Sequence, residues 1–201
     1  MKNLAPRILV LLALVALAPS AAVAQGGPGD GGIYTTTLRN GLKVVVVEDR
    51  AAPVVQSSVW YGFGSLDETA GKTGLAHALE HMMFRGTPEI SAGGLDDVVA
   101  RLGAQMNGET TYDYTQFYFE MPADKIDVAL FIEADRMQHA ALRAADWAVE
   151  RSAVLNELDG DASSPFFNLL ARVRAAAFPG QPAGRTPIGD RRGPVLDDDD
   201  L

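Results

Sequence analysis

The sequence predicts an α+β fold in which a mixed or antiparallel sheet is covered by helices. Two observations support this prediction. Strand-like and helix-like segments both occur along the chain, and they mix without the strict alternation that favours a parallel sheet. The sequence contains no internal repeat, so we expect one principal domain.

Four strand-like runs are predicted. The first two, Tyr34–Leu38 and Leu42–Glu48, flank Asn40-Gly41, a dipeptide that strongly favours a hairpin turn. Val54–Phe63 is predicted as the third strand, and the alternating segment Thr110–Glu120 as the fourth. We expect these runs to form the sheet.

Helical patterns occupy much of the remaining chain. The first predicted helix carries residues 77–81 and ends at the breaker Gly86-Thr87-Pro88. The other helical stretches are expected at about Gly94–Leu102, Ala123–His139, and from Ala145 to Ala177 with an interruption around Gly160–Pro165. We expect these helices to cover the sheet.

Residues 1–24 are predicted to be a secretory signal peptide. Lys2 and Arg7 form its positive region, Ile8–Ala18 its apolar run, and Ala22-Val23-Ala24 a small-residue cleavage site. The run is shorter than the ~20 residues that a membrane span needs, so we expect no stable span. An uncleaved signal that tethers the chain is the alternative. The mature protein is therefore expected to be exported, periplasmic or secreted, and to begin with a Gly-rich linker at residues 25–32.

Composition excludes some classes of function. The chain has no cysteine, which fits an exported protein without disulfides and excludes thiolate metal ligands. Removing the signal leaves 15 of the 17 basic residues against 26 acidic ones, a formal charge of −11. Nucleic acid is therefore disfavoured as a partner, because phosphate binding needs a basic surface. Residues 191–201 are predicted to be a solvated acidic tail.

The segment His77-Ala78-Leu79-Glu80-His81 predicts a hydrolytic zinc site. At 3.6 residues per turn, its two imidazoles and its carboxylate project from one face of a helix. Zinc binds neutral imidazole readily, and a catalytic site uses three protein ligands with a fourth position left to water. The alternative is two surface histidines beside a surface glutamate, although two of the chain's three histidines lie here.

The third ligand must come from elsewhere in the chain. Glu150 and Glu157 are seven residues apart, about two helical turns, so both carboxylates lie on one face of the helix that begins near Ala145. Either glutamate can face the metal. The alternative is that both face solvent, as acidic residues on helices usually do.

The motif His-x-x-Glu-His at residues 77–81, followed by Met82-Met83-Phe84-Arg85-Gly86-Thr87, resembles the zinc helix of the pitrilysin family of inverzincins, which includes insulysin and the mitochondrial processing peptidase. Glu157, preceded seven residues earlier by Glu150, resembles the family's distal glutamate ligand. Further resemblances lie at Gly64–Glu68, at Gly103–Thr110, where Gly108 replaces the family's alanine, and at Glu133–Met137. The match runs from about residue 33 to residue 190 and implies the N-terminal zinc-bearing domain, with the fold of the LuxS/processing-peptidase-like metallohydrolases.

The resemblance implies a role for each matching residue. His77, His81 and Glu157 would bind one Zn²⁺ per chain, and Glu80 would be the general base in peptide-bond hydrolysis by a zinc-activated water. Glu150 would lie outside the ligand set and orient a histidine or tune the charge of the site.

The resemblance also implies residues that bind substrate. In the family a peptide is bound as an added strand at a sheet edge, which assigns substrate binding to Asn107 and an adjoining apolar pocket to Phe84. The alternatives are a turn residue for Asn107 and simple core packing for Phe84. We assign no function to His139, which is expected at a helix end.

Three functional hypotheses follow. The first is a zinc-dependent endopeptidase, or its truncated catalytic half, acting on peptides or unfolded polypeptides. The second is a non-catalytic fragment or subunit that keeps the zinc ligands, because family members enclose substrate between two homologous halves and only one half is matched. The third is a structural zinc protein, for which His139 is the only spare histidine. The match fades after Asp190, so we expect the domain to be incomplete at its C-terminus, with a second homologous domain or subunit as partner.

Overall fold

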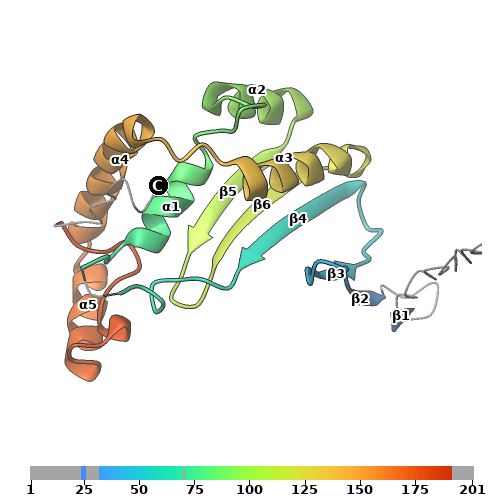
Figure 1. The fold of residues 1–201 in the computed structure, drawn as a ribbon. Coiled ribbons are helices and arrows are strands. Elements are labelled where there is room, and N and C mark those ends of the chain that lie inside the picture. The colour runs from blue at the N-terminus through green and yellow to red at the C-terminus, as the bar shows by residue number, and fades with distance from the viewer. Residues whose placement is uncertain (1–23, 26–31, 70, 192–201) are drawn as a thin grey trace, which may run out of the picture. The chain divides into compact units, whose positions relative to one another are not determined.

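The computed structural model describes residues 24–25, 32–69 and 71–191 (Figure 1). The predicted signal peptide up to residue 23, most of the predicted linker and the acidic tail from residue 192 lie outside the described residues. The chain divides into two compact units, Met1–Ala52 and Pro53–Leu201.

The described part of the first unit is a small antiparallel sheet. Its strand order is β1-β2-β3, with β1 at Ala24–Gln25, β2 at Ile33–Thr37 and β3 at Lys43–Val47. The hairpin predicted at Asn40-Gly41 is confirmed, because β2 and β3 pair in antiparallel register on either side of it. Gly41 has a φ of 91°, a conformation that glycine adopts without steric cost.

The second unit contains an antiparallel sheet of order β4-β6-β5. β4 spans Val54–Tyr61, β5 Gln105–Thr110 and β6 Thr115–Pro122. The prediction of one strand over Thr110–Glu120 is wrong, because Thr111–Tyr114 form a tight turn in which Thr111 N donates to Tyr114 O at 2.8 Å. Apolar alternation continues on both sides of this turn, so alternation alone did not reveal it.

Helices make up most of the rest of this unit. They are α1 at Leu75–Met83, α2 at Ala92–Leu102, α3 at Ile126–His139, α4 at Ala144–Ala162 and α5 at Pro165–Ala177, with short 3₁₀ turns at Ala123–Lys125 and Pro182–Gly184. The predicted interruption is confirmed: Ser163 and Ser164 separate α4 from α5, and the Ser164 hydroxyl accepts a hydrogen bond from Phe167 N. Among the described residues, no helix combines the length and apolarity needed to cross a membrane. The predicted α+β class is confirmed.

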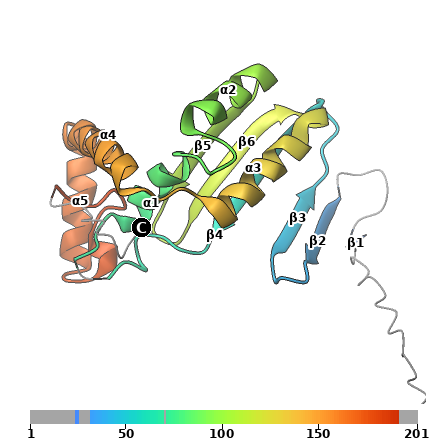
Figure 2. The same cartoon turned by 45° about the horizontal axis from the view of Figure 1, so that its top comes forward.

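One face of β6 forms the main core. Phe117, Phe119 and Met121 alternate along the strand and are at most 3 % exposed. Helices α2 and α3 cover this face (Figure 2), and they contribute the remaining buried apolar side chains of the cluster, Leu95, Ala129 and Ile132. The sheet and these two helices therefore form two packed layers.

A second apolar cluster joins α1 to α4. Ala78 and Met82 of α1 pack against Trp147 and Val154 of α4, and all four side chains are buried. The start of α1 is also fixed, because the buried Glu68 carboxylate accepts hydrogen bonds from Gly74 N at 2.9 Å and Ala76 N at 3.0 Å. A carboxylate at this position satisfies free N–H groups of the first turn and suits the helix dipole.

A buried ion pair lies in the main core. Arg136 donates to both carboxylate oxygens of Glu133, and each side chain is only 2–3 % exposed. The Arg136 guanidinium also lies over the Phe117 ring, 4.2 Å from its centroid. Because both charges are removed from water, each depends on the other.

We predict that Arg136→Met destabilises the protein by about 3–5 kcal/mol, because the Glu133 carboxylate is left buried without its cation. Urea unfolding measures the change in free energy. The matched control is Arg101→Met, whose exposed partner is Asp97 at 3.9 Å and whose loss should cost less than about 1 kcal/mol. Equal losses in the two variants would contradict the prediction.

Candidate metal centre

Three side chains from two helices converge beside α1. His77 and His81 are one turn apart on α1, and Glu157 comes from α4. Glu157 Oε2 lies 3.5 Å from His77 Nε2 and 3.4 Å from His81 Nε2. Among the described residues, this is the group of ionisable side chains that can hold a metal ion, with one donor atom from each residue and all donors within 4.8 Å of one another.

The donor spacing fits a tetrahedral metal ion. Zinc bound at about 2.0–2.1 Å by tetrahedral ligands places neighbouring donor atoms roughly 3.3 Å apart. The two nitrogen–oxygen separations, 3.5 and 3.4 Å, are close to this value. Two imidazoles and one carboxylate also match the protein ligand set of catalytic zinc sites, which leave one position open. The geometry thus selects Glu157, and not Glu150, as the third member of the group.

The electrostatics of the group favour one charged histidine. Burial, with help from the neighbouring charge of His81, lowers the pKa of His77 to about 4. Burial also opposes the charge on His81, but hydrogen bonds to Glu157 and Glu150 outweigh it and raise the His81 pKa. The hydrogen bond from His81 holds the pKa of Glu157 below its usual value. Without a metal, a proton on His81 therefore balances the carboxylate.

Glu150 contacts His81 from outside this group. Its Oε2 lies 3.0 Å from His81 Nδ1, the ring nitrogen opposite the one that faces Glu157. A histidine that binds a metal commonly donates its second ring N–H to such a carboxylate, which fixes the tautomer and the ring orientation. This position is compatible with the predicted orienting role, which stays a prediction. His77 Nδ1 is buried and has no corresponding partner among the described residues.

Glu80 lies on the side of α1 that faces β5. Thr110 Oγ1 donates to Glu80 Oε2 at 2.5 Å, and burial raises the pKa of the Glu80 carboxyl despite this hydrogen bond. Gly108 leaves room for the carboxylate, because a Cβ atom at that position would lie 2.9 Å from Glu80 Oε1. The sequence motif contained Thr110, but its spacing gave no reason to place it against Glu80.

The two residues predicted to bind substrate lie in different environments. Asn107 is exposed on β5, which pairs with β6 and is an edge strand of the described sheet. Phe84 follows the last turn of α1 and packs, partly buried, against the main core, with its ring centroid 5.6 Å from that of Phe117. His139 lies at the end of α3, is 56 % exposed, and bonds to Asp135.

An apolar cavity of about 200 Å³ adjoins Glu80. Its other lining residues are Tyr61, Phe63, Leu79, Met83, Thr115, Phe117 and Leu142. Phe84, the residue that the resemblance assigns to an apolar pocket, is not among these lining residues. No local sequence pattern indicates this cavity, because its walls come from four separate segments of the chain.

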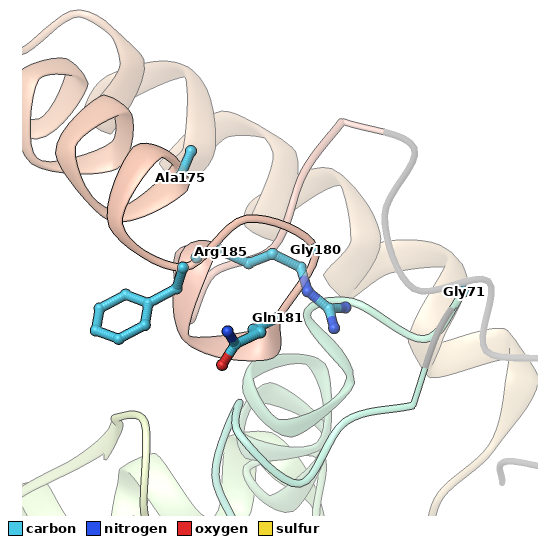
Figure 3. Close-up of a pocket in the computed structure, with 7 residues that line it drawn as sticks. Gly71, Ala175, Gly180, Gln181 and Arg185 are labelled. Carbon is cyan, nitrogen blue, oxygen red and sulfur yellow. The ribbon is translucent and has the colours of Figure 1, made fainter.

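A second cavity of about 330 Å³ lies at the C-terminal end of α5 (Figure 3). It is lined by Gly71, Ala175, Phe178, Gly180, Gln181, Gly184 and Arg185. The Arg185 guanidinium donates to Thr73 Oγ1 at 2.6 Å. The lining of this cavity contains no carboxylate or imidazole, so it offers none of the donor types found in the group on α1 and α4.

Comparison with known proteins identifies the family. The model of the insulinase family, peptidase family M16, matches residues 43–191. The chain is 34 % identical over 157 residues to the zinc protease PqqE of Helicobacter pylori, covering 77 % of this chain and 35 % of that protein. It is 35 % identical over 159 residues to the mitochondrial-processing peptidase subunit beta of Lentinula edodes, covering 78 % and 34 %. The chain therefore spans about a third of the length of these relatives.

Solved structures agree with this assignment. A protease from Helicobacter pylori superimposes with a TM-score of 0.75 at 33 % identity, covering 80 % of this chain and 39 % of that one. An inactive M16 peptidase domain from Pseudomonas fluorescens superimposes with a TM-score of 0.73 at 18 % identity, which bears on the fold alone. The resemblance seen in the zinc-helix motif is confirmed. The chain belongs to the insulinase family of peptidases, family M16.

Proposed function

We propose that this chain is the zinc-binding part of a metalloendopeptidase that hydrolyses peptide bonds. The observation that carries the proposal is the convergence of His77, His81 and Glu157 at tetrahedral spacing, with the Glu80 carboxylate on the same helix. The relatives named as zinc protease and processing peptidase support it.

His77, His81 and Glu157 would hold the zinc ion through their Nε2 and carboxylate oxygen atoms. When bound, zinc supplies Lewis acidity that polarises a carbonyl and lowers the pKa of water toward neutrality. The three donors match the ligands that zinc prefers in catalytic sites. His139 bonds to Asp135 and is not part of this group, which speaks against a closed structural site with four protein ligands.

Glu80 would act as the general base. Its carboxylate takes a proton from the attacking water and delivers it to the departing amine. Burial raises the Glu80 pKa, which brings it closer to the pH at which a base both accepts and returns a proton efficiently. Thr110 holds one oxygen of the carboxylate, so the base has a fixed orientation.

A peptide or unfolded polypeptide would bind along β5. The exposed edge strand offers backbone hydrogen-bonding groups, and Asn107 lies on it. The cavity beside Glu80 is lined mainly by apolar side chains and would take an apolar side chain of the substrate. The role of Phe84 would then be to support this region from the core.

A second homologous half would complete the enzyme. The chain spans about a third of its relatives, and α5 presents an apolar stripe that is 43–69 % exposed, formed by Phe166, Leu169, Leu170 and Val173. Burying such a stripe against a partner domain or subunit would be favourable.

The alternative function is a non-catalytic fragment or subunit that binds zinc without turnover. We further propose export to the periplasm or beyond, from the predicted signal peptide.

We predict that zinc binding near pH 6 releases about one proton per ion. His77, with a pKa of about 4, is already neutral, whereas the raised pKa of His81 leaves it protonated until zinc displaces the proton. Zinc affinity should therefore rise as the pH increases through the His81 pKa. Calorimetric titration in two buffers of different ionisation enthalpy measures the protons released. His139→Ala should leave the count unchanged, and release of no proton or of two would contradict the prediction.

We predict that Glu80→Gln lowers kcat for peptide cleavage by roughly 10²–10⁴-fold, because the base is lost while the metal ligands remain. Zinc content, measured by atomic absorption, should stay at the level of the unmodified protein. The matched control is Glu89→Gln, an exposed carboxylate that lies outside α1, α4 and β5 and should leave kcat unchanged. Cleavage that survives in Glu80→Gln would refute the assignment.

We predict that the chain alone binds zinc but cleaves peptides slowly, and that a separately produced second half from a family member increases the rate. A quenched fluorescent peptide reports cleavage, and chelation should abolish it. The control mixes the same second half with Glu80→Gln, which should stay inactive. Zinc binding with no cleavage in either condition would favour the non-catalytic alternative.

A further inference from the structure

Arg85 connects the end of α1 to the acidic residues of α4. Its Nη1 donates to Glu150 Oε1 at 3.1 Å, and its Nη2 lies 3.7 Å from Asp146 Oδ1. The Glu150 and Asp146 side chains are only 15 % and 16 % exposed. The Arg85 guanidinium therefore contacts two nearly buried carboxylates, which are one turn apart on α4.

The two oxygens of Glu150 have different partners. Oε1 accepts from Arg85, and Oε2 lies 3.0 Å from His81 Nδ1. With both oxygens engaged, the carboxylate cannot rotate without losing one of these contacts. Glu150 therefore links the His81 ring to Arg85, with one carboxylate oxygen on each partner.

The backbone of Arg85 is also held in place. Its N–H donates to Met82 O at 3.0 Å, and its carbonyl accepts from the Arg143 side chain at 3.4 Å. Arg143 immediately precedes α4. The guanidinium thus extends from a fixed point between the two helices that carry the metal group.

We propose that Arg85 is a positioning residue of the metal centre: it holds Glu150 so that His81 Nδ1 is engaged and His81 Nε2 faces the metal. This inference rests on the proposed zinc site. Arg85 would be the third residue in a chain of contacts that starts at the metal and continues through His81 and Glu150. The inference predicts a change in metal affinity, which can be measured without any catalytic activity.

The sign of the effect separates positioning from simple charge. Removing a cation near a metal site makes the local potential more negative, which by itself would tighten binding of a divalent cation. Loss of positioning does the opposite, because His81 is no longer oriented toward the metal. Partners of this kind typically contribute 10–100-fold to metal affinity.

The test measures zinc dissociation constants by competition with a chelating dye, for the unmodified chain and for Arg85→Met, Glu150→Gln and the double variant. We expect Arg85→Met to weaken binding about tenfold. In the Glu150→Gln background the same change should have no further effect, because Arg85 acts through Glu150. Arg85→Lys should restore part of the affinity, since lysine keeps the charge but lacks the planar fork.

The matched control is Arg151→Met, which removes an exposed cation next to Glu150 in the chain and should not weaken zinc binding. Unchanged or tighter binding in Arg85→Met, or additive losses in the double variant, would overturn the inference while leaving the zinc site intact. A chain that binds no zinc in any form would overturn the proposed function and this inference together. If circular dichroism shows that Arg85→Met does not fold, the same zinc dissociation constants are measured for Arg85→Lys with and without Glu150→Gln. Weaker binding in Arg85→Lys that disappears in the Glu150→Gln background would support the inference, and unchanged binding or additive losses would overturn it.

Discussion

The apolar contact between α1 and α4 is the constraint on which the metal centre depends. Ala78 and Met82 pack against Trp147 and Val154. On α1, each ligand histidine comes one residue before one of these apolar residues. On α4, Glu157 comes three residues after Val154, so it lies on the adjacent row of the same helix. Packing the two apolar rows therefore brings the three donor atoms together, and no loop has to be ordered to form the group.

Helix α1 is also held by β5 and at its start. His77 and His81 contact Glu157 of α4, and Glu80 also contacts β5, where Thr110 donates a hydrogen bond to it and Gly108 leaves space for it. The Glu68 carboxylate fixes the first turn of the helix. In the proposed function the metal ligands and the general base therefore share one face of a short helix, and each is supported by a different neighbouring element.

Sequence reasoning predicted the features that depend on helical spacing. His77 and His81 are four residues apart, and Glu150 and Glu157 are seven residues apart. In a helix each of these spacings places the two side chains on one face. It could not choose between Glu150 and Glu157 from spacing alone, because that choice depends on how α4 crosses α1. The family resemblance made the choice, and the geometry agrees with it.

The missed turn is a local feature, whereas the other omissions depend on tertiary contacts. The turn at Thr111–Tyr114 lies between two segments that both alternate, so it was predicted as continuous strand. Arg85 follows His81 by four residues, yet its significance depends on Glu150, 65 residues later. The cavity beside Glu80 has walls from segments far apart in the chain, and no local pattern marks such a set.

A zinc anomalous difference map from crystals of the metal-loaded protein would show whether His77, His81 and Glu157 together bind the ion. We expect one peak about 2.0–2.1 Å from the Nε2 atoms of His77 and His81 and from a carboxylate oxygen of Glu157, with no other protein donor bound. A peak ligated by other side chains, or a peak at His77 and His81 from which Glu157 is absent, would contradict it.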